Sequence, residues 1–137
     1  EMAGIGNITL CGNQMSGTIP QSIGCCARLV RLELQNNQLE GELPEQLGEC
    51  RALKFVRLNN NRLTGPIPPA LGACLELQEL RLQNNQLRGG VPEALGACTK
   101  LVDLQVDGSM LQDGLPAQLQ RWVAEQRLWI NRPRGTT

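Results

Sequence analysis

The apolar residues of this chain recur at the same positions in every 24 residues. With Leu29 counted as position one, positions one, four and six are apolar in five successive periods: Ile5, Ile8, Leu10; Leu29, Leu32, Leu34; Leu53, Val56, Leu58; Leu77, Leu80, Leu82; and Leu101, Leu104, Val106. The apolar–polar–apolar alternation at positions four to six predicts a short strand with one face toward the core. Because one coil cannot bury its leucines alone, we expect successive coils to stack and their strands to form a parallel sheet.

The residues between these strands repeat with the same period and predict a turn followed by a helical segment. Glycine at position thirteen allows backbone angles that other residues resist. An apolar–proline pair at positions fifteen and sixteen, such as Leu43-Pro44, predicts an extended segment that leads into a short helical turn. Position nine is asparagine in four periods, where a buried amide can satisfy backbone groups of its own coil and the next: Asn13, Asn37, Asn61 and Asn85.

The composite pattern, LxxLxLxxNxLxGxIPxxLGxCxx, resembles the plant-type leucine-rich repeat. Repeats of this type are found in receptor-kinase ectodomains and in polygalacturonase-inhibiting proteins. The resemblance implies an α/β solenoid, a right-handed leucine-rich-repeat coil with a parallel β-sheet on its concave face and short helical or 3-10 turns on its convex side. It also implies that the concave face is the binding surface.

The period divides the chain into five repeats, of which the last is degraded: 5–28, 29–52, 53–76, 77–100 and 101–124. Residues 1–4 contain no recognisable cap. We therefore expect an uncapped first coil, whose open strand edge contacts a partner or further chain.

The end of the sequence departs from the repeat. Leu119, Trp122, Val123 and Ile130 stand near helical spacing and predict a capping helix over 117–130, which overlaps the last repeat. A membrane-facing amphipathic helix is the alternative for this segment, although it would want more basic residues on its polar face. Residues 131–137 are basic and are predicted to be loose.

Cysteine stands at position twenty-two of four repeats, as Cys26, Cys50, Cys74 and Cys98. A metal cluster needs thiolates that converge on one point, and a disulfide needs Cβ vectors that face each other. One thiol per coil, about 4.8 Å from the next if it follows the strand spacing, provides neither. We interpret this column as small buried hydrophobic side chains, reduced and without metal. Cys11 and Cys25 lie off the column, on opposite sides of the coil, which argues against a bond between them.

Composition excludes several classes of function. Thirteen basic residues balance thirteen acidic ones, so no global field draws in nucleic acid. No window approaches the ~20 apolar residues of a membrane span. The sequence has no histidine, on which nucleophilic triads and most metal sites draw, and its glycines are explained by the repeat rather than by a phosphate-binding loop. We therefore expect a non-catalytic protein with no cofactor and no metal site.

The candidate binding residues stand at positions three and five, whose side chains should project from the concave sheet. Phe55 is the only phenylalanine, and the period places it on this outer face beside arginines, a composition typical of binding hot spots. Isolated exposed apolar residues are also common, so a purely structural reading stands beside this one. We expect the carboxylates of Glu33, Glu79 and Asp103 to be solvated. The candidate partner-binding residues are Arg31, Glu33, Phe55, Arg57, Glu79 and Arg81.

Two functions compete at this point. The first is a recognition module that binds a protein or peptide on its concave face, and the second is a structural subunit whose first coil is buried against a neighbour. Ice binding, a third function known among plant-type repeats, would want a regular threonine array, and six scattered threonines argue against it.

The cellular compartment stays open on the sequence alone. The family resemblance implies an extracellular or cell-surface protein, whereas the lack of recognisable disulfide caps leaves an intracellular or organellar assembly open. Asn7-Ile8-Thr9 is an acceptor sequence for N-glycosylation if the chain is secreted, although repeat filler is the favoured reading.

Overall fold

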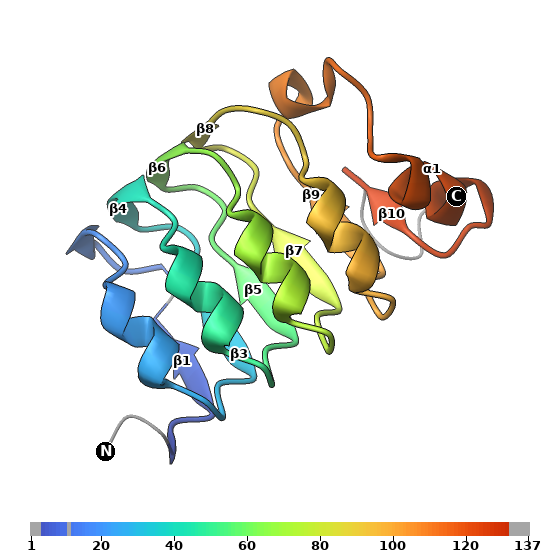
Figure 1. Cartoon of the computed structure of the whole chain (residues 1–137). Coiled ribbons are helices and arrows are strands. Elements are labelled where there is room, and N and C mark those ends of the chain that lie inside the picture. The colour runs from blue at the N-terminus through green and yellow to red at the C-terminus, as the bar shows by residue number, and fades with distance from the viewer. Residues whose placement is uncertain (1–3, 11, 132–137) are drawn as a thin grey trace.

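A parallel sheet with one strand from each coil runs the length of the molecule (Figure 1). The structure, a computed structural model, describes residues 4–10 and 12–131. Neighbouring strands of the repeats pair in register at 24-residue intervals, as in Arg31 with Phe55 and Phe55 with Glu79. The strands, in spatial order, are β1 (Asn7–Thr9), β3 (Arg31–Glu33), β5 (Phe55–Arg57), β7 (Glu79–Arg81), β9 (Asp103–Gln105) and β10 (Trp129–Ile130).

A second parallel sheet, with one strand from each of the first four coils, follows the first sheet along the chain, and the hydrophobic pattern did not predict it. Its strands are short and each offers at most one buried leucine, too little for a period-two signal. Glycine and asparagine around these strands also favour a turn over a strand. The strands are β2 (Ser16–Gly17), β4 (Gln38–Glu42), β6 (Arg62–Gly65) and β8 (Gln86–Leu87).

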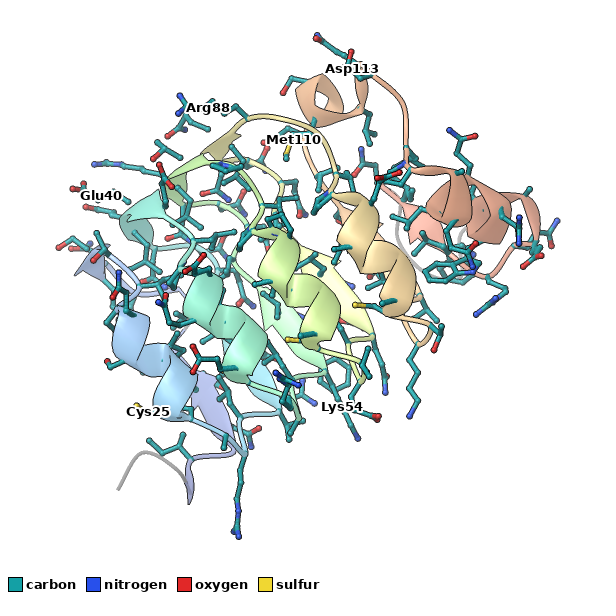
Figure 2. The ribbon with its side chains drawn as sticks, in the orientation of Figure 1. Cys25, Glu40, Lys54, Arg88, Met110 and Asp113 are labelled. Atoms are coloured by element: carbon teal, nitrogen blue, oxygen red, sulfur yellow. The ribbon has the colours of Figure 1, made fainter. Side chains whose placement is uncertain are left out.

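Short 3-10 helices of the first four coils lie side by side, opposite the six-stranded sheet (Figure 1). Each of the first four begins directly after a proline in extended conformation, for example Pro44 at φ −73° and ψ 138°. The predicted apolar–proline entry into a helical turn is therefore confirmed. The helices are η2 (Gln21–Cys25), η3 (Glu45–Glu49), η4 (Pro69–Ala73) and η5 (Glu93–Ala97). A further 3-10 helix, η6 (Gly108–Leu111), follows β9 and lies apart from this row (Figure 1; its Met110 is labelled in Figure 2). Together with the two sheets they confirm the predicted α/β solenoid.

The leucine columns form one continuous core between the sheets and the helices. Leu58, Leu80 and Leu82 in the central coils are fully buried. The first coil differs, because Ile5 and Leu10 are 36% and 46% exposed at positions that the period assigned to the core. These two residues are not part of the core, as expected for an uncapped first coil, since within the described residues no coil packs against the outer side of β1.

The asparagines at position nine form a column of hydrogen bonds between coils. Asn61 Nδ2 donates to the carbonyl of Leu58 in its own coil and of Leu34 in the preceding coil, while Asn61 Oδ1 accepts from the backbone N–H of Leu39. Asn37 and Asn85 make the equivalent contacts in their coils. The predicted backbone-satisfying role is confirmed, but each amide bridges to the preceding coil rather than to the next.

The helix predicted over 117–130 is shorter in the structure. Helix α1 (Ala117–Ala124) ends where Gln126 adopts a positive φ of 61°, and the chain then turns back. Residues Trp129 and Ile130 form strand β10, which pairs with β9 and extends the sheet. The prediction failed because Ile130 stands seven residues after Val123, which matches helical spacing although the chain has already turned out of the helix. Val123, expected in the lid, is 39% exposed, whereas Trp122 is buried at position twenty-two in place of a column cysteine.

Candidate binding face on the six-stranded sheet

The side chains at positions three and five of coils two to four stand together on the outer face of the six-stranded sheet. Strand register places Arg31 beside Phe55 and Phe55 beside Glu79 in one row. The second row holds Glu33, Arg57 and Arg81, again in register. All six candidate residues are therefore brought onto one face by three adjacent strands.

Arginines and carboxylates alternate across this face in a continuous ladder. Arg31 contacts Glu33 at 2.6 Å, and Arg57 Nη1 lies 3.9 Å from the same carboxylate. Arg57 donates from Nε and Nη2 to Glu79 Oε2, at 3.3 Å and 2.8 Å. Arg81 donates in the same way to Asp103 Oδ2, at 3.2 Å and 2.8 Å. We call the six residues from Arg31 to Asp103 the arginine–carboxylate ladder: Arg31, Glu33, Arg57, Glu79, Arg81 and Asp103.

The carboxylates of the ladder are buried, contrary to the expectation of a solvated face. Glu33, Glu79 and Asp103 are 8%, 5% and 0% exposed. A buried carboxylate requires a partner to offset its desolvation, and each has an arginine across the strand or beside it. The sequence pattern did not reveal this, because alternating charges along a strand look the same whether they are solvated or paired.

The arginines cover the carboxylates and form the outer layer of the face. Their side chains are 37%, 28% and 29% exposed for Arg31, Arg57 and Arg81. The hydrogen bond to Glu79 raises the pKa of the Arg57 guanidinium, which keeps its charge. A ligand approaching the sheet therefore meets guanidinium groups first, with the acidic groups beneath them.

Phe55 is not an isolated exposed aromatic. The Arg31 guanidinium carbon lies 4.3 Å from the centroid of its ring, a cation–π contact. Phe55 is half-buried, and its ring stands in register between Arg31 and Glu79. The contact holds the only phenylalanine in a defined place on the face.

A row of asparagines borders the ladder at position eight. Asn36, Asn60 and Asn84 adopt positive φ angles of 62°, 61° and 61°, which asparagine tolerates better than most residues. Their side chains hydrogen-bond from coil to coil, Asn60 Nδ2 to Asn36 Oδ1 and Asn84 Nδ2 to Asn60 Oδ1. The repeated Asn-Asn pair was the available signal for this row, which the pattern analysis did not separate from the asparagine at position nine.

The cysteine column is buried behind this face. Cys26, Cys50, Cys74 and Cys98 are fully buried free thiols, as predicted, and Cys74 Sγ lies 3.4 Å from the carbonyl of Leu47. Burial raises the pKa of Cys50, Cys74 and Cys98 to about 11, 12 and 11, away from the reactive thiolate. Cys25 is exposed, and Cys11 lies outside the described residues, as does most of the predicted basic tail.

Across residues 4–10 and 12–131, the structure brings together no group of three potential metal ligands from His, Cys, Asp or Glu. In the same residues, no helix has the length and apolar character needed to cross a membrane.

The family of the chain follows from its sequence and its architecture together. The Leucine Rich Repeat family model matches residues 28–50, 52–74 and 76–98. The chain belongs to this family, and its solved structural neighbours place it with the plant-type repeats. Among curated proteins, none matches the sequence.

Three solved structures similar to this chain are plant proteins. The receptor RGFR1, a plant peptide hormone receptor in complex with RGF2, is 30% identical with a TM-score of 0.78 over 92% of this chain and 20% of its own. The ectodomain of the Arabidopsis thaliana receptor kinase GASSHO1/SCHENGEN3, in complex with CASPARIAN STRIP INTEGRITY FACTOR 2, is 36% identical with a TM-score of 0.70 over 73% of this chain and 13% of its own. A plant ice-binding protein is 27% identical with a TM-score of 0.69 over 74% and 33%. The chain therefore spans a third or less of each of these proteins.

Proposed function

We propose that this chain is a non-catalytic recognition module that binds a protein or peptide on the outer face of its six-stranded sheet. The observation that carries the proposal is the layered face itself, in which buried carboxylates hold partly exposed arginines in place and Arg31 stacks on Phe55. Arginine and aromatic residues dominate protein-binding hot spots. Side chains already fixed by internal contacts lose little entropy when a partner binds.

Similar proteins support a role in binding a protein or peptide. RGFR1 and GASSHO1/SCHENGEN3 are each solved in complex with a partner that their descriptions name, RGF2 and CASPARIAN STRIP INTEGRITY FACTOR 2. A partner of this chain would contact Arg31, Phe55, Arg57 and Arg81 directly. Glu33 and Glu79, proposed from the sequence as contact residues, would act beneath them by orienting the arginines.

Selection from a random-sequence peptide library against the immobilised chain tests the proposal. Peptides that bind should lose about 1–3 kcal/mol of affinity to the Phe55→Ala variant, because truncation removes the central aromatic contact. Leu75→Ala is the matched control, since Leu75 is an apolar side chain 54% exposed outside the sheet. Equal loss in both variants, or selection of peptides that ignore both, would contradict the proposal.

Arginine-to-lysine changes refine the test without removing charge from above the buried carboxylates. Arg57→Lys should weaken the selected peptides because lysine cannot reproduce the planar two-point contact of a guanidinium. Arg62→Lys, on β6 of the second sheet, should leave affinity unchanged. Alanine at position 57 is a poorer test, because it would leave Glu79 buried without its partner and destabilise the fold.

A structural subunit of a larger assembly remains the second candidate, and one observation favours it. Ile5 and Leu10, which the repeat makes apolar, are exposed beside β1 and could be covered by a neighbouring chain. Light scattering coupled to size exclusion separates the two functions. A stable monomer favours the recognition module, and self-association that Leu10→Ser abolishes favours the subunit.

A further inference from the structure

A groove on the side of the solenoid, away from the ladder, has the chemistry of a second binding site. It encloses about 520 Å³ and crosses the first three coils, where each chain segment passes from the second sheet to its 3-10 helix. These segments lie side by side between β4, β6 and the helices (Figure 1). Volumes of this size are typical of ligand sites.

Exposed proline rings form two sides of the groove. Pro20 in the first coil and Pro66 and Pro69 in the third coil are exposed, and all three line it. Pro20 has φ −76° and ψ 151°, close to polyproline II geometry. Proline segments in this geometry are rigid surfaces that aromatic side chains recognise.

Two carboxylates occupy the middle of the groove, on the second coil. Glu42 ends strand β4 and Glu45 begins η3, and both are exposed. In the part of the chain that the structure describes, neither carboxylate has a hydrogen bond or an ion pair, and the groove lining contains no lysine or arginine. This contrasts with the ladder, where every carboxylate is paired.

The backbone around Glu42 explains how its side chain is held at the groove. A Cβ atom built on Gly65, which has a φ of 76°, would lie 2.6 Å from Glu42 Cγ. The absence of a side chain at Gly65 therefore makes room for the stem of Glu42. The neighbouring carboxylate on the same strand, Glu40, stands in register with Arg62 instead, while Glu42 stands in register with Thr64.

From this arrangement we propose that the groove binds a peptide segment carrying a lysine or arginine next to an aromatic residue. The cationic side chain lies between Glu42 and Glu45, and the aromatic ring packs on Pro66 and Pro69. The coils are about 4.8 Å apart, so the groove from the first coil to the third spans about 10 Å, the length of roughly three extended residues. A two-residue segment is shorter than this span, so with a bent backbone its two adjacent side chains, which would point to opposite faces of an extended chain, reach both features at once.

The test uses three capped tetrapeptides, Gly-Arg-Tyr-Gly, Gly-Glu-Tyr-Gly and Gly-Arg-Ala-Gly, titrated into the isotopically labelled chain and followed by amide chemical shifts. Gly-Arg-Tyr-Gly should perturb the amides of Gln21, Glu42 and Gln46, which border the groove. The other two peptides should bind at least about tenfold more weakly, because each lacks one of the two contacts. Added salt should weaken the first peptide, since the contact with the carboxylates is exposed.

The chain offers a matched control for the carboxylates. Glu45 and Glu93 are both exposed, both follow a proline and both begin a 3-10 helix, but only Glu45 lines the groove. A Glu42→Gln, Glu45→Gln double variant should weaken Gly-Arg-Tyr-Gly at least about tenfold, and Glu93→Gln should not change its affinity. The variants should keep the fold, because the two side chains make no polar contacts within the described residues.

Three results would overturn the proposal: no perturbation at the groove, perturbation that persists in the double variant, or equal binding of all three peptides. If the shifts fall instead on Phe55 and Arg57, the peptide binds the sheet face and the groove is not its site. Because the groove and the ladder share no residues, either site can fail in these experiments while the other stands.

Discussion

The third coil and the first coil are built from the same repeat but have different neighbours. Residues 53–76 are packed between coils on both sides, and their core leucines, including Leu58, are fully buried. The first coil contacts another coil on one side only in the described structure, and Leu10, at the same position as Leu58, is 46% exposed. The difference teaches that burial in this fold belongs to the interface between coils rather than to the coil itself.

Thiol reactivity should show the largest contrast. Cys74 is fully buried with a pKa near 12, and Cys25 at the end of η2 is exposed. In native protein at pH 8, iodoacetamide should modify Cys25 more than about a hundredfold faster than Cys74, because the thiolate is the nucleophile. Raising the pH toward 11 should increase the modification rate of Cys74 only in proportion to the fraction of its thiol that is deprotonated. The fold still limits access of the reagent to this buried side chain.

Mass spectrometry of timed samples measures this contrast. As a control, alkylation of the unfolded, unreduced protein should label Cys26, Cys50, Cys74 and Cys98 alike. Two blocked thiols among these four would show that the cysteine column is oxidised. The interpretation of these cysteines as reduced core side chains would then be wrong.

Truncating the same leucine position should cost very different amounts in the two coils. Leu58→Ala opens a cavity between two neighbouring coils and should lower the free energy of unfolding by about 2–5 kcal/mol. Leu10→Ala removes a half-exposed side chain and should cost about 1 kcal/mol or less. Urea denaturation of both variants measures the difference, and equal midpoints would mean that the coils contribute independently.

The asparagine column should show a similar contrast. Asn61→Ala leaves the Leu39 N–H and the Leu34 carbonyl without their buried partner, at a cost of about 2–3 kcal/mol. Asn13 donates to the Leu10 carbonyl at an exposed site, where water can replace the lost bond, so Asn13→Ala should cost well under about 1 kcal/mol. The hydrogen-exchange rate of the Leu39 amide should rise in the Asn61 variant alone. An unchanged rate would mean that the asparagine column does not stabilise the contact between coils.

The smallest contrast concerns the spacing of the helices. A Cβ on Gly72 would lie 2.4 Å from the Ala94 carbonyl oxygen, so Gly72→Ala must push two helices apart, at about 1–3 kcal/mol. A Cβ on Gly96 would meet Gln118 Cβ at 3.3 Å, a contact that a shift of a few tenths of an ångström relieves. Gly96→Ala should be neutral or stabilising by up to about 1 kcal/mol, because alanine restricts the unfolded chain. Thermal unfolding measures both, and equal shifts in midpoint would mean that helix contact does not set the spacing.

Much of the architecture could be predicted because each coil repeats one local solution. Asparagine at position nine, the apolar–proline pair and the buried leucines each act within a coil and its neighbour, so their period carries the register of the whole sheet. The sequence predicted where the candidate site lies, but not that its carboxylates are buried and paired with arginines. The period placed Arg57 and Glu79 on one face, yet only the coil spacing shows that Arg57 reaches across to bury and pair that carboxylate.

The sequence by itself determined the solenoid, its register and the side of each strand that faces the core, because these follow from a period that every coil repeats. The tertiary structure alone decided the second sheet, the return of the chain into β10 after α1, the pairing of the ladder and the groove at Glu42 and Glu45. These features depend on distances between side chains of different coils. Such distances arise only once the coils are stacked, so no pattern along a single strand could express them.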